Sequence, residues 1–234
     1  YPGDDFGDAP SPYATLLSAD GARHYAGGPT LGPLRDWDAD GQPTAAAVGD
    51  DTDGTDDEDG VTFGTVQVGK LDCTVTVNVA NAPSGAKLDA WVDFNRDGDW
   101  NDVMPDGTPE WAVQNQAVGA VSPGTFTFTT DPFVAWHPGV QVDPLWMRIT
   151  LGDRRLAPGA NAPVEGGAGP YDGYAFGETE DYLLTDYDQR LYDFGDAPDA
   201  AGAAGYPTLL ANNGARHLLG SRLTLGATAD AEFD

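Results

Sequence analysis

The clearest strand pattern in the chain reads Lys87-Leu88-Asp89-Ala90-Trp91-Val92-Asp93-Phe94. Every second side chain along it is apolar, in the order Leu88, Ala90, Val92 and Phe94. Because successive side chains of a strand point to opposite faces of its sheet, this period of two predicts a strand with one face in a core. An acidic loop punctuated by Gly98 follows directly, beginning at Asp93.

Further candidate strands lie between turns rich in glycine and proline. They cover residues 61–68, 71–79, 125–130, 145–151 and 180–185. Helical periodicity is almost absent, whereas the chain has 31 Gly and 18 Pro residues. Short alternating strands separated by turn clusters predict an all-β fold, an antiparallel β-sandwich of the Ig-like or jelly-roll-like kind. Cys73 stands alone in the chain and on the apolar side of 71–79, so we expect a buried structural thiol.

An internal duplication organises the chain. Asp-Phe-Gly-Asp-Ala-Pro at 5–10 returns at 193–198, and Gly-Ala-Arg-His at 21–24 returns at 214–217. Between them, Thr-Leu-Leu at 15–17 returns at 208–210, and Thr-Leu-Gly at 30–32 returns at 224–226. Matching motifs in the same order predict a tandem repeat, with a period of 188 residues from residue 5 to residue 193.

The repeat divides the chain into three predicted parts. Residues 1–60 form an irregular acidic segment rich in Gly and Pro, which we call the cap segment. Residues 61–186 carry the strands of the β-sandwich. Residues 187–234 begin a second, truncated cap segment, and we expect it to dock against a following module or a neighbouring subunit.

The net charge of the chain limits the classes of partner that we expect it to bind. Against 11 basic residues stand 38 acidic ones, a formal net charge of −27. Phosphates and anionic membrane surfaces are repelled by such a protein, so nucleic acid is not an expected partner. No stretch approaches the ~18 apolar residues of a membrane span, so no membrane insertion is expected in this segment. Divalent cations are the natural partners.

Three acidic clusters have the spacing of cation ligands. The first is an Asp-x-Asp-x-Asp-Gly loop at 36–41, the second an Asp-x-Asn-x-Asp-Gly-Asp loop at 93–99, and the third a dense run at 50–60. In such loops alternate oxygen ligands point inward and the glycine permits the turn around Ca²⁺. The candidate calcium ligands are Asp36, Asp38, Asp40, Asp50, Asp51, Asp53, Asp56, Asp57, Asp59, Asp93, Asn95, Asp97 and Asp99.

A solvated acidic turn is the alternative for each cluster taken singly. The seven acids within 50–59 would repel one another if they folded without a cation, which favours Ca²⁺ at one or more of the clusters. The loop at 93–99 is not an EF-hand, because Met104 stands where the twelfth-position glutamate belongs. Asp102 or Asp106 could complete a loop of another shape.

Catalytic motifs are missing from the sequence. It contains no G-x-S-x-G elbow, H-E-x-x-H helix, phosphate loop or dinucleotide fingerprint, so we expect no enzyme activity. The paired histidines His24 and His217 are expected to make structural hydrogen bonds. Aromatic residues leave one alternative open, a sugar-stacking face built from Trp91, Trp100, Trp111, Trp136, Trp146, Tyr171 and Tyr174.

Two longer acidic motifs lie in the part of the chain that carries the predicted strands. They are Trp91-Val92-Asp93-Phe94-Asn95-Arg96-Asp97-Gly98-Asp99-Trp100 and Gly177-Glu178-Thr179-Glu180-Asp181-Tyr182. Together with the repeated motifs, they resemble the GEVED domain and its preceding acidic segment, found in repeat-containing bacterial surface or secreted proteins. Thr179 stands where the name-giving Gly-Glu-Val-Glu-Asp has valine. By analogy with the family, Glu178, Glu180 and Asp181 are expected to help ligate the cation of the 93–99 loop.

These observations lead to one expected function and one alternative. The resemblance implies a β-rich extracellular repeat rather than a reaction. We expect a non-catalytic, calcium-stabilised structural repeat of a surface protein, stalk or fibre, whose partners are neighbouring repeats or identical subunits. An extracellular or cell-surface location follows from the need for calcium. The alternative is an adhesin or carbohydrate-binding module that binds glycans.

Overall fold

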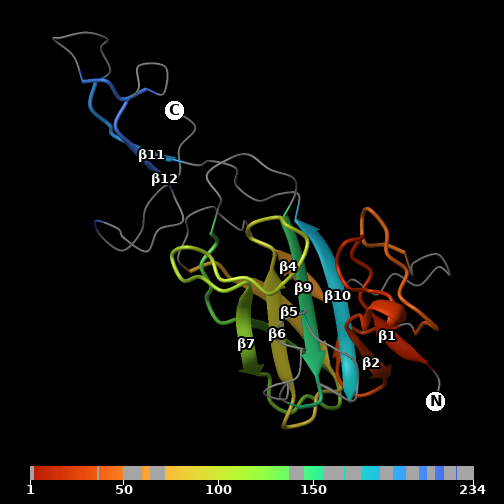
Figure 1. The fold of residues 1–234 in the computed structure, drawn as a ribbon. Helices are drawn as coiled ribbons and strands as arrows, with labels where there is room; N and C mark the ends of the chain where they lie inside the picture. The colour runs from red at the N-terminus through yellow and green to blue at the C-terminus, as the bar shows by residue number, and fades with distance from the viewer. Residues whose placement is uncertain are drawn as a thin grey trace.

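The computed structural model describes residues 3–35, 37–49, 60–63, 72–136, 145–154, 166, 175–184, 192–198, 206–209, 214–218 and 225. These residues form two sheets that enclose a core, and a separate two-stranded hairpin (Figure 1). The only helix among them is the three-residue 3₁₀ helix η1 (Leu17–Ala19). The described part of the chain contains no helix that is long and apolar enough to cross a membrane. The predicted all-β sandwich is confirmed.

The larger sheet has six strands in the order β1-β2-β10-β9-β6-β7. Their bounds are β1 Asp4–Phe6, β2 Arg23–Ala26, β10 Phe176–Leu184, β9 Leu145–Gly152, β6 Lys87–Val92 and β7 Trp111–Ala117. Neighbouring strands are antiparallel except for β2 and β10, which pair in parallel at Tyr25 with Phe176 and at Ala26 with Gly177. The cap segment thus extends the sheet beyond the edge of β10.

The smaller sheet is built around β5 (Val75–Ala80). Two short strands, β3 (Thr30–Leu31) and β4 (Val61–Phe63), pair with successive parts of β5. The strand β8 (Thr125–Thr129) pairs with β5 as well, along residues 76–80. Since β3 comes from the cap segment, that segment supplies strands to both sheets.

The main core lies between the two sheets. It contains alternate residues of β5, β6 and β9, namely Val75, Val77, Val79, Leu88, Ala90, Val92, Leu145, Met147, Ile149 and Leu151. Cys73 is 1% exposed in the same core, as expected for a structural thiol. Fully burying an aliphatic side chain contributes about 1.5–3 kcal/mol, so this layer is the main source of stability.

A second core covers the outer face of the larger sheet. It joins Trp91, Trp100 and Trp146 of the sandwich to Ala9 and Tyr13 of the cap segment. The cap segment therefore explains why all eight residues of β9 are buried. The odd-numbered residues of β9 from 145 to 151 face the main core, while Trp146, Arg148 and Thr150 are buried on the other face of the sheet.

The predicted strands are present with shifted ends. The strand predicted over 180–185 begins at Phe176, and residues 64–68 of the first predicted strand lie outside the described residues. The pattern missed β7, whose polar residues interrupt the alternation and whose pairing with β6 contains register shifts. It also missed β1, β2 and β3, because strands of two to four residues are too short to show a period.

Hydrogen bonds fasten the cap segment to β10. A carboxylate oxygen of Asp5 accepts from the Thr179 amide at 2.7 Å. The hydroxyl of Thr179 lies 3.1 Å from Nδ1 of His24 and 3.2 Å from the hydroxyl of Thr150. Thr179, which replaces the family's valine, therefore adds polar contacts to this junction, and His24 has the structural role predicted for it.

His24 should make the protein sensitive to acid. Burial, together with the charge of Arg35, lowers the pKa of His24 from 6.5 to about 3, while the charge of Asp153 acts in the opposite direction. Below pH 6.5 the His24 side chain therefore binds a proton in the unfolded chain but stays neutral in the folded protein. This group contributes a loss of stability as pH falls from 6.5 toward 3, by about 1.4 kcal/mol per pH unit.

The test compares free energies of unfolding between pH 4 and pH 8 for the wild-type protein and His24→Asn. The variant should show a shallower pH dependence, by about one proton. His217→Asn is the matched control, because its side chain is exposed in the second copy of the motif. Parallel curves for wild type and His24→Asn would contradict the prediction.

Candidate metal centre

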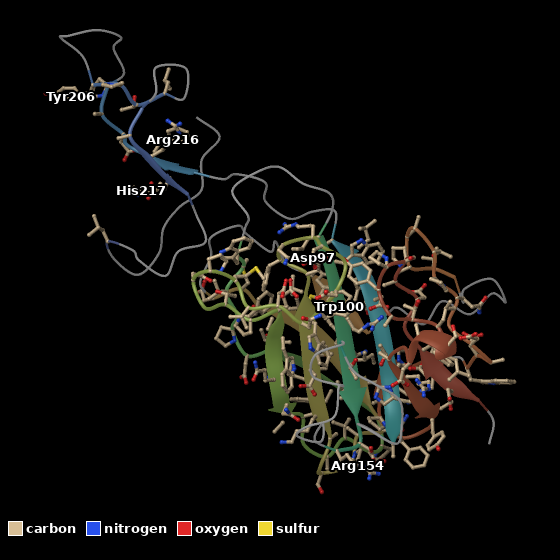
Figure 2. The ribbon with its side chains drawn as sticks, in the orientation of Figure 1. Asp97, Trp100, Arg154, Tyr206, Arg216 and His217 are labelled. Atoms are coloured by element: carbon tan, nitrogen blue, oxygen red, sulfur yellow. The ribbon has the colours of Figure 1, made fainter. Side chains whose placement is uncertain are left out.

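The strongest candidate for a metal site is the loop that connects β6 to β7, residues 93–110. The loop folds back on itself through paired contacts between Asp102 and Glu110. The Glu110 amide donates to the Asp102 carbonyl at 3.0 Å, and the Asp102 amide donates to Oε2 of Glu110 at 3.0 Å. Figure 2 shows Asp97 and Trp100 of this loop at one end of the sandwich, with Arg154 at the other.

Asp93 closes the first turn of the loop. Its side chain is buried and accepts from the amides of Asp97 at 3.2 Å and Gly98 at 3.1 Å, and also from the Tyr13 hydroxyl. Burial raises the pKa of Asp93. Gly98 has a φ of 94°, and a Cβ at this position would lie 2.2 Å from Cγ of Pro12. Asp93 and Gly98 of the Asp-x-Asn-x-Asp-Gly pattern thus serve both the turn and its contact with the cap segment.

An acidic group lies at the surface of this loop. Carboxylate oxygens of Asp97, Asp99 and Asp102 lie within 4.8 Å of one another, and the described residues contain no other such group. The Asn95 amide nitrogen donates to Asp97 at 2.9 Å and to Asp102 at 2.6 Å. Desolvation, the hydrogen bond shared with Asp97 and the nearby charges raise the pKa of Asp102. Such a group could hold a metal ion.

Glu110 is the residue that the sequence interpretation missed. It is 0% exposed, and while Oε2 accepts from the Asp102 amide, Oε1 is buried with no hydrogen-bond partner among the described residues. Burial raises the pKa of Glu110 to about 8, and the charges of Asp93, Asp97 and Asp102 act in the same direction. Glu110 is not one of the three acids whose oxygens lie within 4.8 Å of one another, but a buried oxygen without a donor in the same loop is suited to a cation.

A sequence signal for Glu110 existed but was weak. It is the only glutamate between Glu58 and Glu165. A search for a twelfth-position ligand stops at Met104, whereas the chain makes a turn over 104–108 before Glu110 returns to the loop. The backbone pairing that brings it back is not visible as a pattern.

The GEVED-motif acids lie elsewhere. Glu178, Glu180 and Asp181 are buried in β10 and are not part of the group formed by Asp97, Asp99 and Asp102. Glu178 accepts from the Leu31 amide and lies 3.7 Å from the Arg35 guanidinium. Glu180 accepts from the Tyr182 hydroxyl. These contacts hold the cap segment and the strand together.

Asp181 forms a buried ion pair with Arg148. Two guanidinium nitrogens donate to its two oxygens, each at 2.7 Å, and both side chains are 0% exposed. The Ala9 amide donates to the same carboxylate at 2.8 Å, and Arg148 donates to the Ala14 carbonyl at 3.2 Å. The guanidinium also lies 5.4 Å from the centre of the Trp100 ring. The pair therefore connects the sheet, the cap segment and the acidic loop.

In the first acidic loop, at 36–41, the described aspartates hydrogen-bond to nearby backbone and side-chain groups and stabilise turns. Asp38 accepts from the Gln42 side chain at 2.8 Å, and Asp40 accepts from the amides of Leu17 at 2.6 Å and Gly41 at 2.9 Å. The other predicted ligands of the cap segment lie outside the described residues, namely Asp36, Asp50, Asp51, Asp53, Asp56, Asp57 and Asp59. Their role in metal binding stays a prediction.

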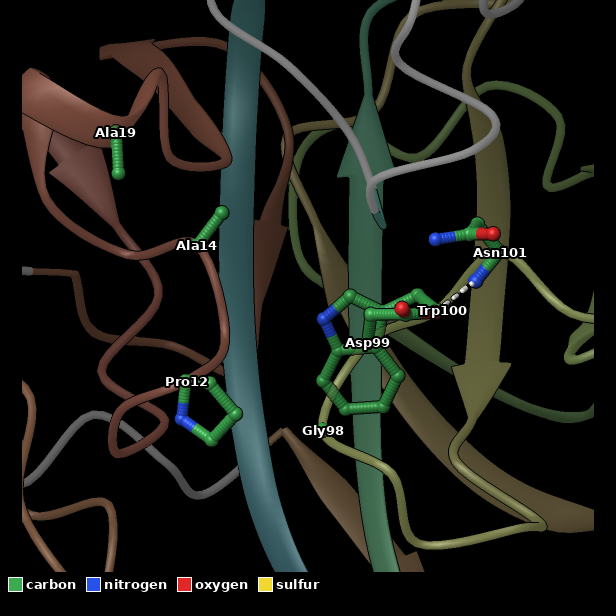
Figure 3. A pocket seen from close by; sticks show the side chains of 7 residues that line it. All are labelled: Pro12, Ala14, Ala19, Gly98, Asp99, Trp100 and Asn101. Carbon is green, nitrogen blue, oxygen red and sulfur yellow. Dashed lines mark hydrogen bonds between the residues drawn. The ribbon is translucent and has the colours of Figure 1, made fainter.

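A small hollow lies where the cap segment meets the loop. Its volume is about 220 Å³, and it is lined by Pro12, Ala14, Ala19, Gly98, Asp99, Trp100 and Asn101 (Figure 3). Trp100 is nonetheless only 2% exposed, because Tyr13 stacks on it with ring centroids 4.5 Å apart.

Three of the seven aromatic residues proposed for sugar stacking are buried inside the protein. Trp91 and Trp146 are buried like Trp100, while Trp111 stacks on Trp91 and donates to Asp89 at 2.9 Å. Trp136 is half-buried, and Tyr171 and Tyr174 lie outside the described residues.

The fold and the loop together define an all-β module with an acidic, Gly-punctuated loop at one end of its sandwich. Residues 87–185 match the family model of the GEVED domain, so this part of the chain is a GEVED domain. The match includes the 93–110 loop and the acids of β10, whereas the cap segment precedes it. No curated protein and no solved structure matches the chain.

Tyr13 offers a test of the contact between the cap segment and the loop. Tyr13→Phe removes the hydroxyl that donates to the buried Asp93 carboxylate, so we expect a loss of about 1–3 kcal/mol in the free energy of unfolding. Tyr206, the corresponding residue of the second copy, is 69% exposed, and Tyr206→Phe should change stability by less than about 0.5 kcal/mol. Chemical denaturation measures both, and equal effects would contradict the contact.

Proposed function

We propose that the chain is a non-catalytic structural module in which Ca²⁺ bound by the 93–110 loop fixes the cap segment to the β-sandwich. The observation that carries this proposal is the buried Oε1 of Glu110, which has no hydrogen-bond partner among the described residues and lies in the same loop as the group formed by Asp97, Asp99 and Asp102. A carboxylate in such a place is costly unless a cation or a proton neutralises it.

The ligands that we assign to the ion are the side chains of Asp97, Asp99, Asp102 and Glu110, with Asp93 and Asn95 of the same loop. All are oxygen ligands, which hard cations prefer and which disfavour zinc and copper. Ca²⁺ accepts six to eight such oxygens in an adaptable geometry, whereas Mg²⁺ demands a regular octahedron. An irregular loop rich in carboxylates therefore favours calcium.

The ion would act through charge and order. It would neutralise the repulsion among the acids of the loop, which belongs to a chain of net charge −27. The same loop contacts the cap segment through Asp93 and Trp100, so ordering the loop would also strengthen the junction with Tyr13. In this proposal calcium stiffens a building block rather than assisting a reaction.

The duplication and the GEVED domain support a tandem repeat of an extracellular surface protein, stalk or fibre. Calcium is plentiful outside cells and scarce in the cytosol, so a module that needs it would be complete after export. The glycan-binding alternative has less support, because Trp91, Trp100 and Trp146 are buried.

The experiment is thermal unfolding of the chelator-treated protein, titrated with Ca²⁺ and separately with Mg²⁺. A ligand that binds only the folded state adds about 2.7 kcal/mol at a hundred times its Kd, so Ca²⁺ should raise Tm by several degrees and Mg²⁺ by less. Asp99→Asn should reduce the shift. Asp131→Asn is the control, because this exposed residue lies outside the loop.

Glu110→Gln separates metal binding from simple packing. The amide keeps the size of the side chain and removes its charge, so the metal-free protein should be at least as stable as wild type while the calcium shift shrinks. The proposal would be refuted if Ca²⁺ did not raise the Tm of the wild-type protein more than Mg²⁺ does. It would also be refuted if the calcium-dependent rise in Tm were the same in Glu110→Gln as in the wild type.

A further inference from the structure

The hairpin formed by β11 (Tyr192–Phe194) and β12 (Arg216–Leu218) is a second copy of β1 and β2. The registers agree, since Asp5 pairs with His24 as Asp193 pairs with His217. The turns agree as well: the Gly21 amide donates to the Leu16 carbonyl at 3.0 Å, and the Gly214 amide donates to the Leu209 carbonyl at 2.9 Å. The repeated motifs therefore encode the same local structure twice.

The two copies differ in what covers them. In the first copy, His24 and Leu31 are 0% exposed and Tyr13 is 8% exposed. Their counterparts in the second copy are exposed: His217 lies at the surface, Tyr206 is 69% exposed and Leu225 is fully exposed. Among the described residues, β11 and β12 pair with no other strand (Figures 1 and 2).

The first copy shows what these side chains bind. Its Asp5 carboxylate and Ala9 amide bind β10 at Thr179 and Asp181. Gly7 lies so close to this strand that a Cβ would be 2.5 Å from an Asp181 oxygen, and Tyr13 bonds to Asp93.

Each docking residue has a counterpart in the second copy. Asp193, Gly195, Ala197 and Tyr206 correspond to Asp5, Gly7, Ala9 and Tyr13. Apart from its chain neighbours, no atom of the described residues lies within 4 Å of a Cβ built at Gly195, so the described residues give no reason for a glycine there. Within the part of the chain that the structure describes, the second copy thus has the docking residues without the surface that they fit.

We propose that the β11–β12 hairpin docks on a second GEVED domain, adding β12 beside that domain's β10 equivalent and covering its Arg–Asp ion pair. The β10 edge of this chain is already paired with β2, so the hairpin fits another sandwich rather than its own. Addition of strands to an open sheet edge supplies backbone hydrogen bonds, and the alternate side chains supply specificity. This inference rests on the proposed structural repeat and names its partner.

The experiment extends the full chain by a second sandwich. Residues 41–186 are appended after Asp234, which reproduces the Asp40–Gly41 junction at the matching place in the second copy. Amide hydrogen exchange of residues 192–194 and 216–218 should slow by about tenfold or more relative to the 234-residue chain and approach that of β1 and β2. Unchanged exchange beside a folded second sandwich would overturn the proposal.

Gly195→Val provides the matched variant. In the 234-residue chain it should leave stability unchanged, because a side chain at this position meets none of the described residues beyond its chain neighbours. In the extended chain it should abolish the protection of the hairpin by colliding with the Asp181 equivalent, as Gly7→Val should displace the first cap segment in both proteins. Protection that survives Gly195→Val would contradict docking through this surface.

A second measurement applies if the added sandwich does not fold. Gly7→Val in the full chain opens the β10 edge, which should then take up a β11–β12 hairpin, seen as hairpin protection or concentration-dependent dimerisation. Adding Gly195→Val should remove both effects, and their absence from the Gly7→Val protein would overturn the proposal. A protected hairpin without a calcium response would refute only the calcium proposal, and a calcium response without protection would refute only the docking.

Discussion

The buried ion pair between Arg148 and Asp181 constrains the rest of the structure. Two charges removed from water are tolerated only when their remaining hydrogen-bonding groups are satisfied. The larger sheet alone cannot do this, and the cap segment completes the set with the Ala9 amide and the Ala14 carbonyl. Gly7 is the residue that lets the backbone come close enough. The cap segment is therefore part of the sandwich and not an appendage of it.

The same pair connects the cap segment to the acidic loop. The Arg148 guanidinium lies over Trp100, Tyr13 stacks on Trp100, and the Tyr13 hydroxyl donates to Asp93 at the start of the loop. A cation in the loop and a docked cap segment would thus stabilise each other, because each orders residues that the other contacts. The duplication extends this linkage beyond one module in our proposal, since a second cap segment would bring the same residues to a second sandwich.

The sequence predicted those features that repeat or alternate. The alternation in 87–94 and 145–151 located β6 and β9, and the Asp-x-Asn-x-Asp-Gly pattern located the acidic loop. Pairs formed over long separations were not predictable from these patterns. Arg148 and Asp181 are 33 residues apart and Ala9 and Asp181 are 172 apart. Neither separation has a local signature.

Glu110 and the GEVED acids show where analogy and spacing reached their limits. Glu110 reaches the loop through a turn whose length no ligand motif specifies. Glu178 and Asp181 were expected to bind the cation because they are acidic and belong to the family motif. In the structure their carboxylates bind Leu31, Arg148 and Ala9 and lie outside the group formed by Asp97, Asp99 and Asp102, because buried acids also serve to hold backbone amides and guanidinium groups. Their role in metal binding stays a prediction.

The most direct test of this account is the free energy of unfolding of Arg148→Met against that of Arg154→Met. Arg154 pairs with Asp153 at 2.8 Å but its side chain is 57% exposed, so its loss should cost less than about 1 kcal/mol. Arg148→Met leaves Asp181 buried without its partner and should cost about 3–5 kcal/mol, with faster amide exchange at Ala9 and Gly98 together. If the two variants cost the same, or if exchange rises at neither amide, the ion pair does not hold the structure together.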